Sequence, residues 1–193
     1  MGGDNTVLIV ATMDTKGTEV LYLAERFKEN DIPFLLLDAG IRGTSPFPVS
    51  ISREEVAISG GLPLSEVQNI KSEGEALSVM IKGAIIKTKD LLEQGNIHGI
   101  ISVGGSMGTT LGTAVMRSLP VGFPKIMITT MASRDTRPFV GTKDIMMLHS
   151  ICDISGINRI TRKILHNAAL AMAGMVKGHG ALPCPGKPLV VLS

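Results

Sequence analysis

The chain has 193 residues, of which 44% are hydrophobic and only 3% aromatic, and its 19 basic and 17 acidic side chains leave a formal charge of +2. This length allows one large domain or two small lobes, with a core that needs no disulfide or metal. The balanced charge and the shortage of aromatic rings argue against nucleic-acid binding, and every hydrophobic run is interrupted well before the roughly 18 residues that a membrane span requires.

The first predicted elements are two strands joined by a helix. Residues 7–11 form an apolar run, followed by the polar segment TMDTKGTE and then by apolar residues at helical spacing over 20–27. A second apolar run, 34–37, ends at Asp38. The Gly- and Pro-rich segment 40–48 that follows is predicted to be a loop.

Two capping boxes predict the next helices. Ser52 with Glu55, and Ser72 with Glu75, have the S-x-x-E spacing in which side chain and backbone cap each other. The first box begins a short helix that two glycines end. The second begins a helix of about five turns that reaches Gly95.

The second half of the chain continues the alternation of strand and helix. Strands are predicted at 97–103, 125–130 and 144–148, with helices at 109–117 and 157–176. Such alternation produces right-handed parallel crossovers. We therefore predict a Rossmann-like three-layer α/β fold with a mainly parallel sheet, in which ligands bind beyond the carboxyl ends of the strands.

The strongest candidate for a binding site is the segment GGSMGTT at 104–110, between a predicted strand and a predicted helix. Its glycines would let backbone N–H groups surround phosphate oxygens, and the helix N-terminus adds positive partial charge. The segment matches neither the G-x-G-x-x-G fingerprint nor a P-loop. The alternative is a tight turn that needs glycine for positive φ angles.

A second polar segment follows the first strand and therefore lies at the same edge of the sheet. Thr15 would donate to phosphate oxygens, Lys16 would neutralise them, and Asp14 would hold a magnesium ion or act as a base. The alternative is that Asp14 or Thr15 caps the first helix while Lys16 is solvated.

Two further candidates follow the second and fourth strands. Asp38 lies roughly 20 residues after the first polar segment, as does the ribose-binding acid of dinucleotide folds, although a capping role is equally consistent. Ser133 and Arg134 would complete an anion site, the alternative for Arg134 being a surface position.

Cysteine usage and the N-terminus bear on the compartment. Cys152 and Cys184 show neither CxxC spacing nor a neighbouring histidine pair, so we expect reduced structural thiols. Residues 1–6 carry no secretory signal, so we expect a soluble, cytoplasmic protein. The surplus of apolar residues favours self-association.

Four ordered motifs together resemble the Tm-one-like ATP-binding domain family of tomato mosaic virus resistance proteins and their bacterial and fungal relatives. The motifs are TMDTKGTE, GGSMGTT, LPVGFPKIMITTMAS and VGTKDIMM with DISGINRITRKILHNAALAMAGMV. The resemblance implies a Rossmann-like N-terminal domain over 1–187 that binds ATP, with Mg²⁺ as a further candidate. It also implies that 188–193 form the first strand or linker of a second α/β domain, and that the protein is a homodimer.

Carried over by motif, the resemblance assigns ten residues to the nucleotide. They are Thr12, Asp14, Thr15, Lys16, Gly17, Gly104, Gly105, Ser106, Gly108 and Thr109. Two positions depart from the family pattern, which usually has a small residue, commonly glycine, at Met107 and commonly glycine at Arg134.

Three functions are therefore compared. The leading hypothesis is an ATP-binding domain whose two polar segments hold the phosphates. The second is half of a metabolic enzyme that acts on a phosphorylated or carboxylated small molecule. The third is a dimerising interaction module that nucleotide stabilises. The sequence assigns no catalytic residue beyond the candidate Asp14, because ATP cleavage needs a positioned water and charge stabilisation that no residue pair uniquely supplies.

Overall fold

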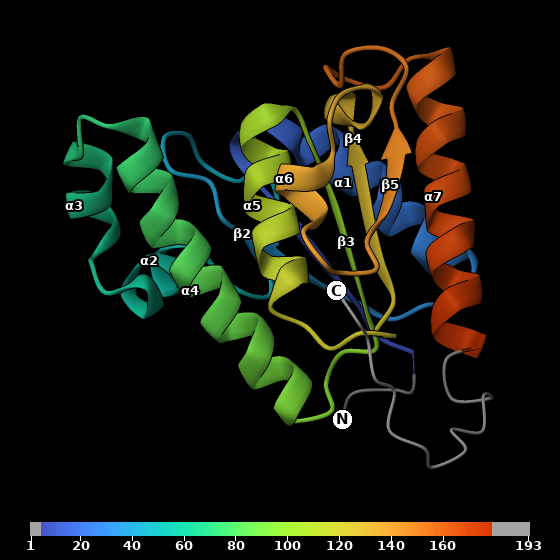
Figure 1. Cartoon of the computed structure of the whole chain (residues 1–193), viewed down its shortest axis with the longest axis horizontal. Helices are drawn as coiled ribbons and strands as arrows, with labels where there is room; N and C mark the ends of the chain where they lie inside the picture. Colours follow the sequence, from blue (N-terminus) through green and yellow to red (C-terminus); the bar gives the residue numbers. More distant parts are fainter. Residues whose placement is uncertain (1–4, 179–193) are drawn as a thin grey trace.

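Five parallel strands form the centre of the computed structural model, which describes residues 5–178 (Figure 1). Their order across the sheet is β2-β1-β3-β4-β5, and every neighbouring pair is parallel. In this doubly wound order the direction of winding reverses between β1 and β3. The strands are β1 (Val7–Ala11), β2 (Phe34–Asp38), β3 (Gly99–Gly104), β4 (Lys125–Thr129) and β5 (Met146–His149).

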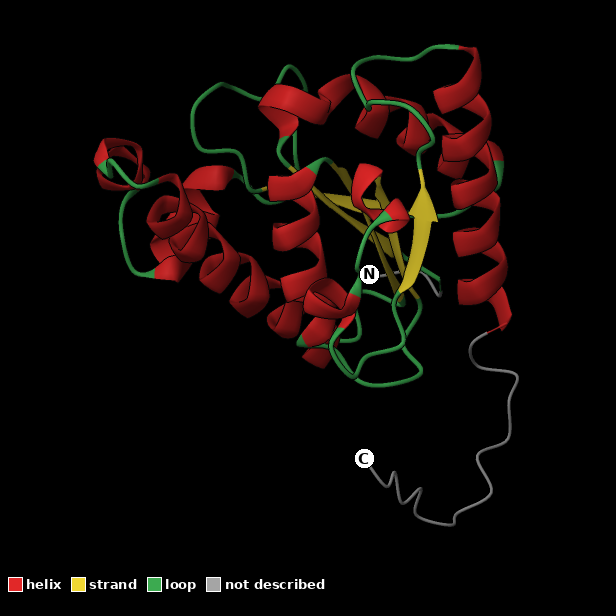
Figure 2. Cartoon of the chain, turned by 45° about the horizontal axis from the view of Figure 1, so that its top comes forward, coloured by secondary structure: helices red, strands yellow, loops and turns green. Residues whose placement is uncertain are grey.

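Helices cover both faces of the sheet and make three layers (Figure 2). Val7 and Ile9 of β1 pack with one set of helices, whereas Leu8 and Val10 pack with the other. Successive side chains of a strand point to opposite faces, so a strand buried on both sides reads as one continuous apolar run. The first set is α1 (Met13–Glu29) and α7 (Arg159–Gly178), and the second is α2 (Arg53–Gly60), α3 (Leu64–Asn69), α4 (Glu73–Glu93) and α5 (Ser106–Arg117).

The predicted Rossmann-like α/β fold with a parallel sheet is thus confirmed, and so are both helix starts at the capping boxes. Ser52 Oγ accepts a hydrogen bond from the Glu55 N–H, and the Glu55 carboxylate accepts one from the Ser52 N–H at 2.8 Å. Ser72 Oγ accepts from the Glu75 N–H at 3.3 Å. Gly61 ends α2 with a left-handed φ of 110°.

Several boundaries differ from the sequence prediction. α1 begins at Met13 and α5 at Ser106, so both polar segments that were expected as loops form the first turns of helices. The first N–H groups of a helix have no intrahelical partner, which makes glycine less costly there than in a helix interior. The short helix α3 was not predicted, and β5 begins at Met146 rather than at Asp144.

Two glycines allow α2 and α4 to cross with their backbones in contact. A Cβ atom at Gly83 would lie 1.8 Å from the carbonyl oxygen of Val56, and one at Gly60 would lie 2.2 Å from that of Val79. Real Cβ contacts of this length do not occur, so neither position accepts a side chain unless the helices move apart. The crossing therefore fixes the position of α4 relative to α2.

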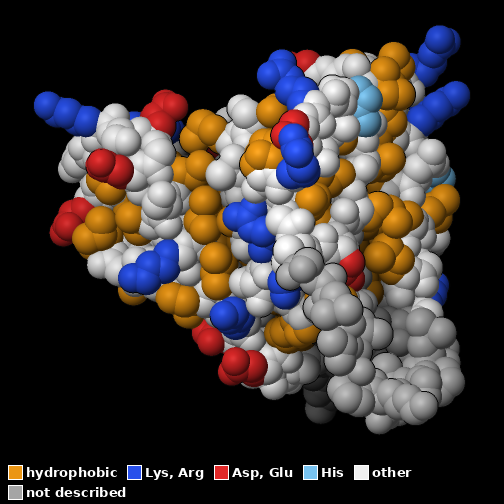
Figure 3. Space-filling view, viewed as in Figure 1, with side chains coloured by type: hydrophobic (Ala, Val, Ile, Leu, Met, Phe, Trp, Pro, Cys, Tyr) orange, Lys and Arg blue, Asp and Glu red, His pale blue; other side chains and the backbone are white. Residues whose placement is uncertain are grey.

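Hydrophobic side chains also gather on the surface over β5 and α7, at the right of Figure 3. Those with large exposed areas on these two elements are Met146, Ile160 and Leu170. The expected homodimer stays a prediction. None of the helices within 5–178 combines the length and the apolarity needed to cross a bilayer.

Two sequence predictions concern the C-terminal end of the chain. The predicted strand or linker 188–193 and the thiol of Cys184 lie outside the described residues. The Cys152 thiol is half-buried and free.

Candidate functional site

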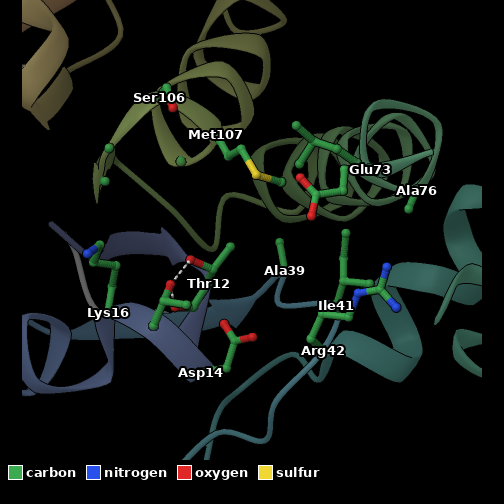
Figure 4. Close-up of a pocket in the computed structure, with 15 residues that line it drawn as sticks. Thr12, Asp14, Lys16, Ala39, Ile41, Arg42, Glu73, Ala76, Ser106 and Met107 are labelled. Carbon is green, nitrogen blue, oxygen red and sulfur yellow. Dashed lines mark hydrogen bonds between the residues drawn. The ribbon is translucent and has the colours of Figure 1, made fainter. Parts of the chain in front are cut away.

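A cavity of about 430 Å³ opens where the winding of the sheet reverses. Its walls come from the β1–α1 junction, the segment after β2, the first turn of α4 and the β3–α5 junction (Figure 4). β1 and β3 are parallel neighbours, so their carboxyl ends open onto the same edge. Cavities of roughly 300–1000 Å³ are typical of small-molecule sites, and doubly wound sheets bind their ligands at this position.

Most of the predicted binding residues line this cavity, and the two polar segments face it together. From the β1–α1 junction it is lined by Thr12, Asp14, Thr15 and Lys16, and from the β3–α5 junction by Gly104, Gly105, Ser106 and Gly108.

Gly104 and Gly105 are glycines for different reasons. A Cβ atom at Gly104 would lie 2.7 Å from the Cα of Gly108, so the close packing of α5 on the end of β3 excludes a side chain. A Cβ atom at Gly105 would meet nothing within 4 Å, and the φ of this residue is −77°. Neither glycine has a positive φ angle, so the alternative explanation as a tight turn is wrong. Nothing in the fold itself requires glycine at position 105, and the space beside it belongs to the cavity.

The N-termini of α1 and α5 border the cavity. The N-cap residues Thr12 and Gly105 accept no hydrogen bond through a side chain, although at α1 the first N–H, that of Met13, is bound by Asp38. Each helix end carries about half a positive charge on N–H groups that lack intrahelical partners. The arrangement favours an anion.

The side chains of the β1–α1 junction are tied to their surroundings. The hydroxyls of Thr12 and Thr15 are 2.7 Å apart, as the dashed line in Figure 4 marks. The Lys16 ammonium donates to the carbonyl of Ile154, in the connection between β5 and α7. Lys16 thus lines the cavity, while its ammonium group is hydrogen-bonded to the connection between β5 and α7.

Two carboxylates lie near each other, Asp14 in the wall of the cavity and Asp38 outside its lining. Asp14 Oδ2 accepts from the Gly43 N–H at 3.0 Å, whereas its Oδ1 is buried and has no hydrogen-bond partner among the described residues. Asp38 Oδ1 accepts from the N–H groups of Met13 at 3.0 Å and Gly40 at 2.8 Å. Burial, reinforced by the charge of Asp14, raises the pKa of Asp38 above its ordinary 3.8 despite these hydrogen bonds.

Asp38 therefore acts within the fold, and it does not line the cavity as the ribose-binding comparison had suggested. Its Oδ1 joins the first turn of α1 to the segment after β2. This bond to Met13 also places the start of α1 against the end of the neighbouring strand.

We expect Asp38→Asn to unfold at the same or a higher temperature than the unchanged protein at pH 7. The amide oxygen of Asn can accept both backbone hydrogen bonds, and the substitution removes a desolvated charge.

The pKa of Asp38 is raised in the folded state, so the stability that this residue contributes falls as the pH rises from 3.8 through the folded-state pKa. The advantage of Asn should therefore vanish toward pH 4. Asp38→Ala leaves two N–H groups unpaired and should cost about 1–3 kcal/mol. Thermal unfolding from pH 4 to 8 tests both, and an Asn variant as unstable as the Ala variant would contradict this assignment.

Four predicted residues are not brought to the cavity. Gly17 packs beneath Pro46, whose Cγ would lie 2.8 Å from a Cβ at Gly17. Thr109 is buried, and its hydroxyl donates to the Gly105 carbonyl and lies 2.5 Å from the Thr129 hydroxyl. These contacts position the start of α5 against the end of β4. Ser133 and Arg134 are exposed at the end of the short 3₁₀ helix η1 (Thr130–Ser133), away from the lining residues.

The cavity also contains residues that the sequence analysis did not assign. Arg42 follows β2, at the edge of the sheet where ligands were expected. This position after a strand could have identified it from the sequence. Glu73 begins α4 beside the cap Ser72, and no sequence pattern indicates that this helix end reaches the site. The residues not assigned are Ala39, Ile41, Arg42, Glu73, Ala76, Leu77 and Met107.

The fold and the cavity define a doubly wound α/β domain with a ligand-sized cavity at its switch point. The chain belongs to the uncharacterised protein family UPF0261, and the model of the N-terminal domain of that family matches residues 5–181. The resemblance predicted from the four motifs is thereby confirmed.

Relatives from bacteria and tomato support this membership. A UPF0261 protein of Clostridium tetani is 43% identical over 95% of this chain and 46% of its own length. A UPF0261 protein of Mesorhizobium japonicum is 36% identical over 97% of this chain and 46% of its own length. The ToMV resistance protein Tm-1 of Solanum lycopersicum is 33% identical over 89% of this chain and 25% of its own length. The chain thus spans less than half the length of these relatives.

Proposed function

We propose that this domain binds a nucleotide, with ATP as the first candidate, and that the cavity at the switch point holds its phosphates. The observation that carries the proposal is the convergence of two helix N-termini, those of α1 and α5 after the neighbouring strands β1 and β3, on one cavity. Helix N-termini that follow parallel strands bind phosphate groups through free N–H groups and the helix dipole.

The open space at Gly105 supports the same proposal. Phosphate oxygens reach backbone N–H groups only where no side chain intervenes, and this position has no other need for glycine. The hydroxyls of Thr12, Thr15 and Ser106 line the same walls and add donors.

A magnesium ion bound with the phosphates would find one free carboxylate oxygen. Asp14 Oδ1 is buried and has no partner within residues 5–178, and a carboxylate beside phosphates is repelled unless a cation lies between them. Mg²⁺ is commonly bound by one or two carboxylates together with substrate phosphates. Asp14 fits this role, and the ion would supply charge neutralisation there.

Calorimetric titration with ATP tests the proposal. We expect saturable binding that Mg²⁺ strengthens, and a rise in melting temperature that follows the ATP concentration. Asp14→Asn removes the carboxylate but keeps an oxygen for the Gly43 N–H. This variant should bind ATP without the gain from Mg²⁺.

Two outcomes would count against the proposal. The absence of any heat or melting shift with millimolar ATP or ADP would contradict it directly. Binding of a phosphorylated or carboxylated metabolite in the absence of nucleotide binding would instead favour the metabolic-enzyme hypothesis.

A further inference from the structure

The cavity has a second charged end, opposite the phosphate-binding walls. In Figure 4, Glu73 and Arg42 lie on the side away from Lys16, and Ile41 and Met107 lie nearer to that side. The Met107 side chain extends from the start of α5 toward the side on which Glu73 lies. The thioether therefore lies toward the Glu73 end of the cavity and away from Lys16.

Glu73 and Arg42 line the same cavity but are not paired with each other. No ion pair or hydrogen bond involves the Glu73 carboxylate within residues 5–178. The Arg42 guanidinium donates instead to the Gln68 carbonyl at 2.9 Å, and the Gln68 amide donates to the Ile41 carbonyl at 2.8 Å. Gln68 thus fixes the segment after β2, and the Glu73 carboxylate remains free for a ligand.

Glu73 is exposed, and its carboxylate lines a cavity whose other walls favour an anion. As the first residue of α4, Glu73 interacts favourably with the helix dipole, but Glu75 in the same turn does so without lining the cavity. A carboxylate only accepts hydrogen bonds at neutral pH, so it repels phosphate and attracts a part of the ligand that donates. In a nucleotide, the ribose offers two adjacent hydroxyl donors, and acids in doubly wound folds bind this group.

We infer that Glu73 is a specificity-determining residue that accepts hydrogen bonds from the 2′- and 3′-hydroxyls of a ribonucleotide, while Ile41, Leu77 and Met107 form the apolar surface against the base. This inference rests on the proposed function and adds the sugar to it. Apolar walls with a polarisable thioether suit the face of a purine.

The test compares three probes, namely ATP, 2′-deoxyATP and inorganic tripolyphosphate, by calorimetry on the unchanged protein and on Glu73→Gln. We expect ATP to bind about 10-fold more tightly than 2′-deoxyATP, because a hydrogen bond to a charged group is lost. Glu73→Gln should weaken ATP binding by about 10-fold and abolish the preference for ribose. The same variant should bind tripolyphosphate as well as the unchanged protein or better, since a repulsive charge is gone.

Glu75→Gln is the matched control, because it changes the same residue type in the same helical turn outside the cavity. It should leave all three affinities unchanged. A preference for ATP over 2′-deoxyATP that survives in Glu73→Gln would overturn the inference about Glu73. If Glu73→Gln keeps that preference and still binds tripolyphosphate, the inference about Glu73 fails but the proposed phosphate site stands. If the unchanged protein binds neither ATP nor tripolyphosphate, the proposed function itself fails.

Discussion

Valine at position 105 should abolish nucleotide binding and leave the fold intact. The backbone of Gly105 is extended, with φ −77° and ψ −153°, and a Cβ atom there would meet nothing within 4 Å. A branched side chain would instead occupy the space beside the first N–H groups of α5. Loss of two charge-assisted hydrogen bonds costs about 3–6 kcal/mol, which corresponds to a rise in Kd of at least about 100-fold.

Calorimetry with ATP and thermal unfolding together test this prediction. Gly105→Ala should give a smaller loss of affinity than Gly105→Val, because it fills less of the space. Gly174→Val is a control on α7, where an added Cβ also meets nothing within 4 Å. Retention of full ATP affinity in Gly105→Val, with an unchanged melting temperature, would show that phosphates do not contact this loop.

The second large effect is expected at Gly83, where one methyl group should strongly destabilise the protein. A Cβ atom there would lie 1.8 Å from the Val56 carbonyl oxygen and 2.9 Å from the Gly60 nitrogen. Both contacts involve backbone atoms, so no side-chain rotation relieves them and α4 must move away from α2. Overpacking costs about 1–3 kcal/mol and occasionally more, and we expect the upper end of this range.

Gly74→Ala adds the same methyl group to the same helix and is the matched control. Its nearest neighbour would be the Ser72 Oγ at 3.9 Å, an ordinary contact. Alanine restricts the unfolded chain more than glycine does, so Gly74→Ala should stabilise the protein by about 0.5 kcal/mol. Denaturant unfolding of both variants measures the difference. Equal stabilities would show that the helices do not cross as closely as the structure indicates.

The position of α4 also connects stability to the site, since Glu73, Ala76 and Leu77 belong to its first turns. If Gly83→Ala folds at low temperature, its shifted α4 should weaken ATP binding more than tripolyphosphate binding. Phosphates would still meet the N-termini of α1 and α5, which directly follow β1 and β3.

Local patterns predicted most of the fold. The continuous apolar runs at 7–11 and 34–37 identified strands because both faces of a parallel sheet are buried. The spacing of Ser52 and Glu55 identified a helix start because the cap acts within one turn. The boundaries of α1 and α5 were wrong by several residues, because glycine near a strand end indicates a loop and a first helical turn equally well.

The site was predicted only in part, for a related reason. The residues that follow β1 and β3 were found because parallel strands bring their carboxyl ends to one edge. Ser133 and Arg134 follow a strand as well, but η1 intervenes after β4 and neither residue lines the cavity. Glu73 follows no strand and reaches the cavity only because α4 packs against α2 and α5.

The sequence by itself determined the order of most strands and helices, the helix starts at Ser52 and Ser72, and the two polar segments at the edge of the sheet. Each of these depends on residues close together in the chain. Only the tertiary structure decided which ends of these helices share a cavity, why Gly104 and Gly105 differ, and where Asp38 and Glu73 act. Those properties depend on contacts between residues distant in sequence, such as Gly83 with Val56 and Gly43 with Asp14. Packing fixes such contacts, and a pattern of neighbouring residues does not encode them.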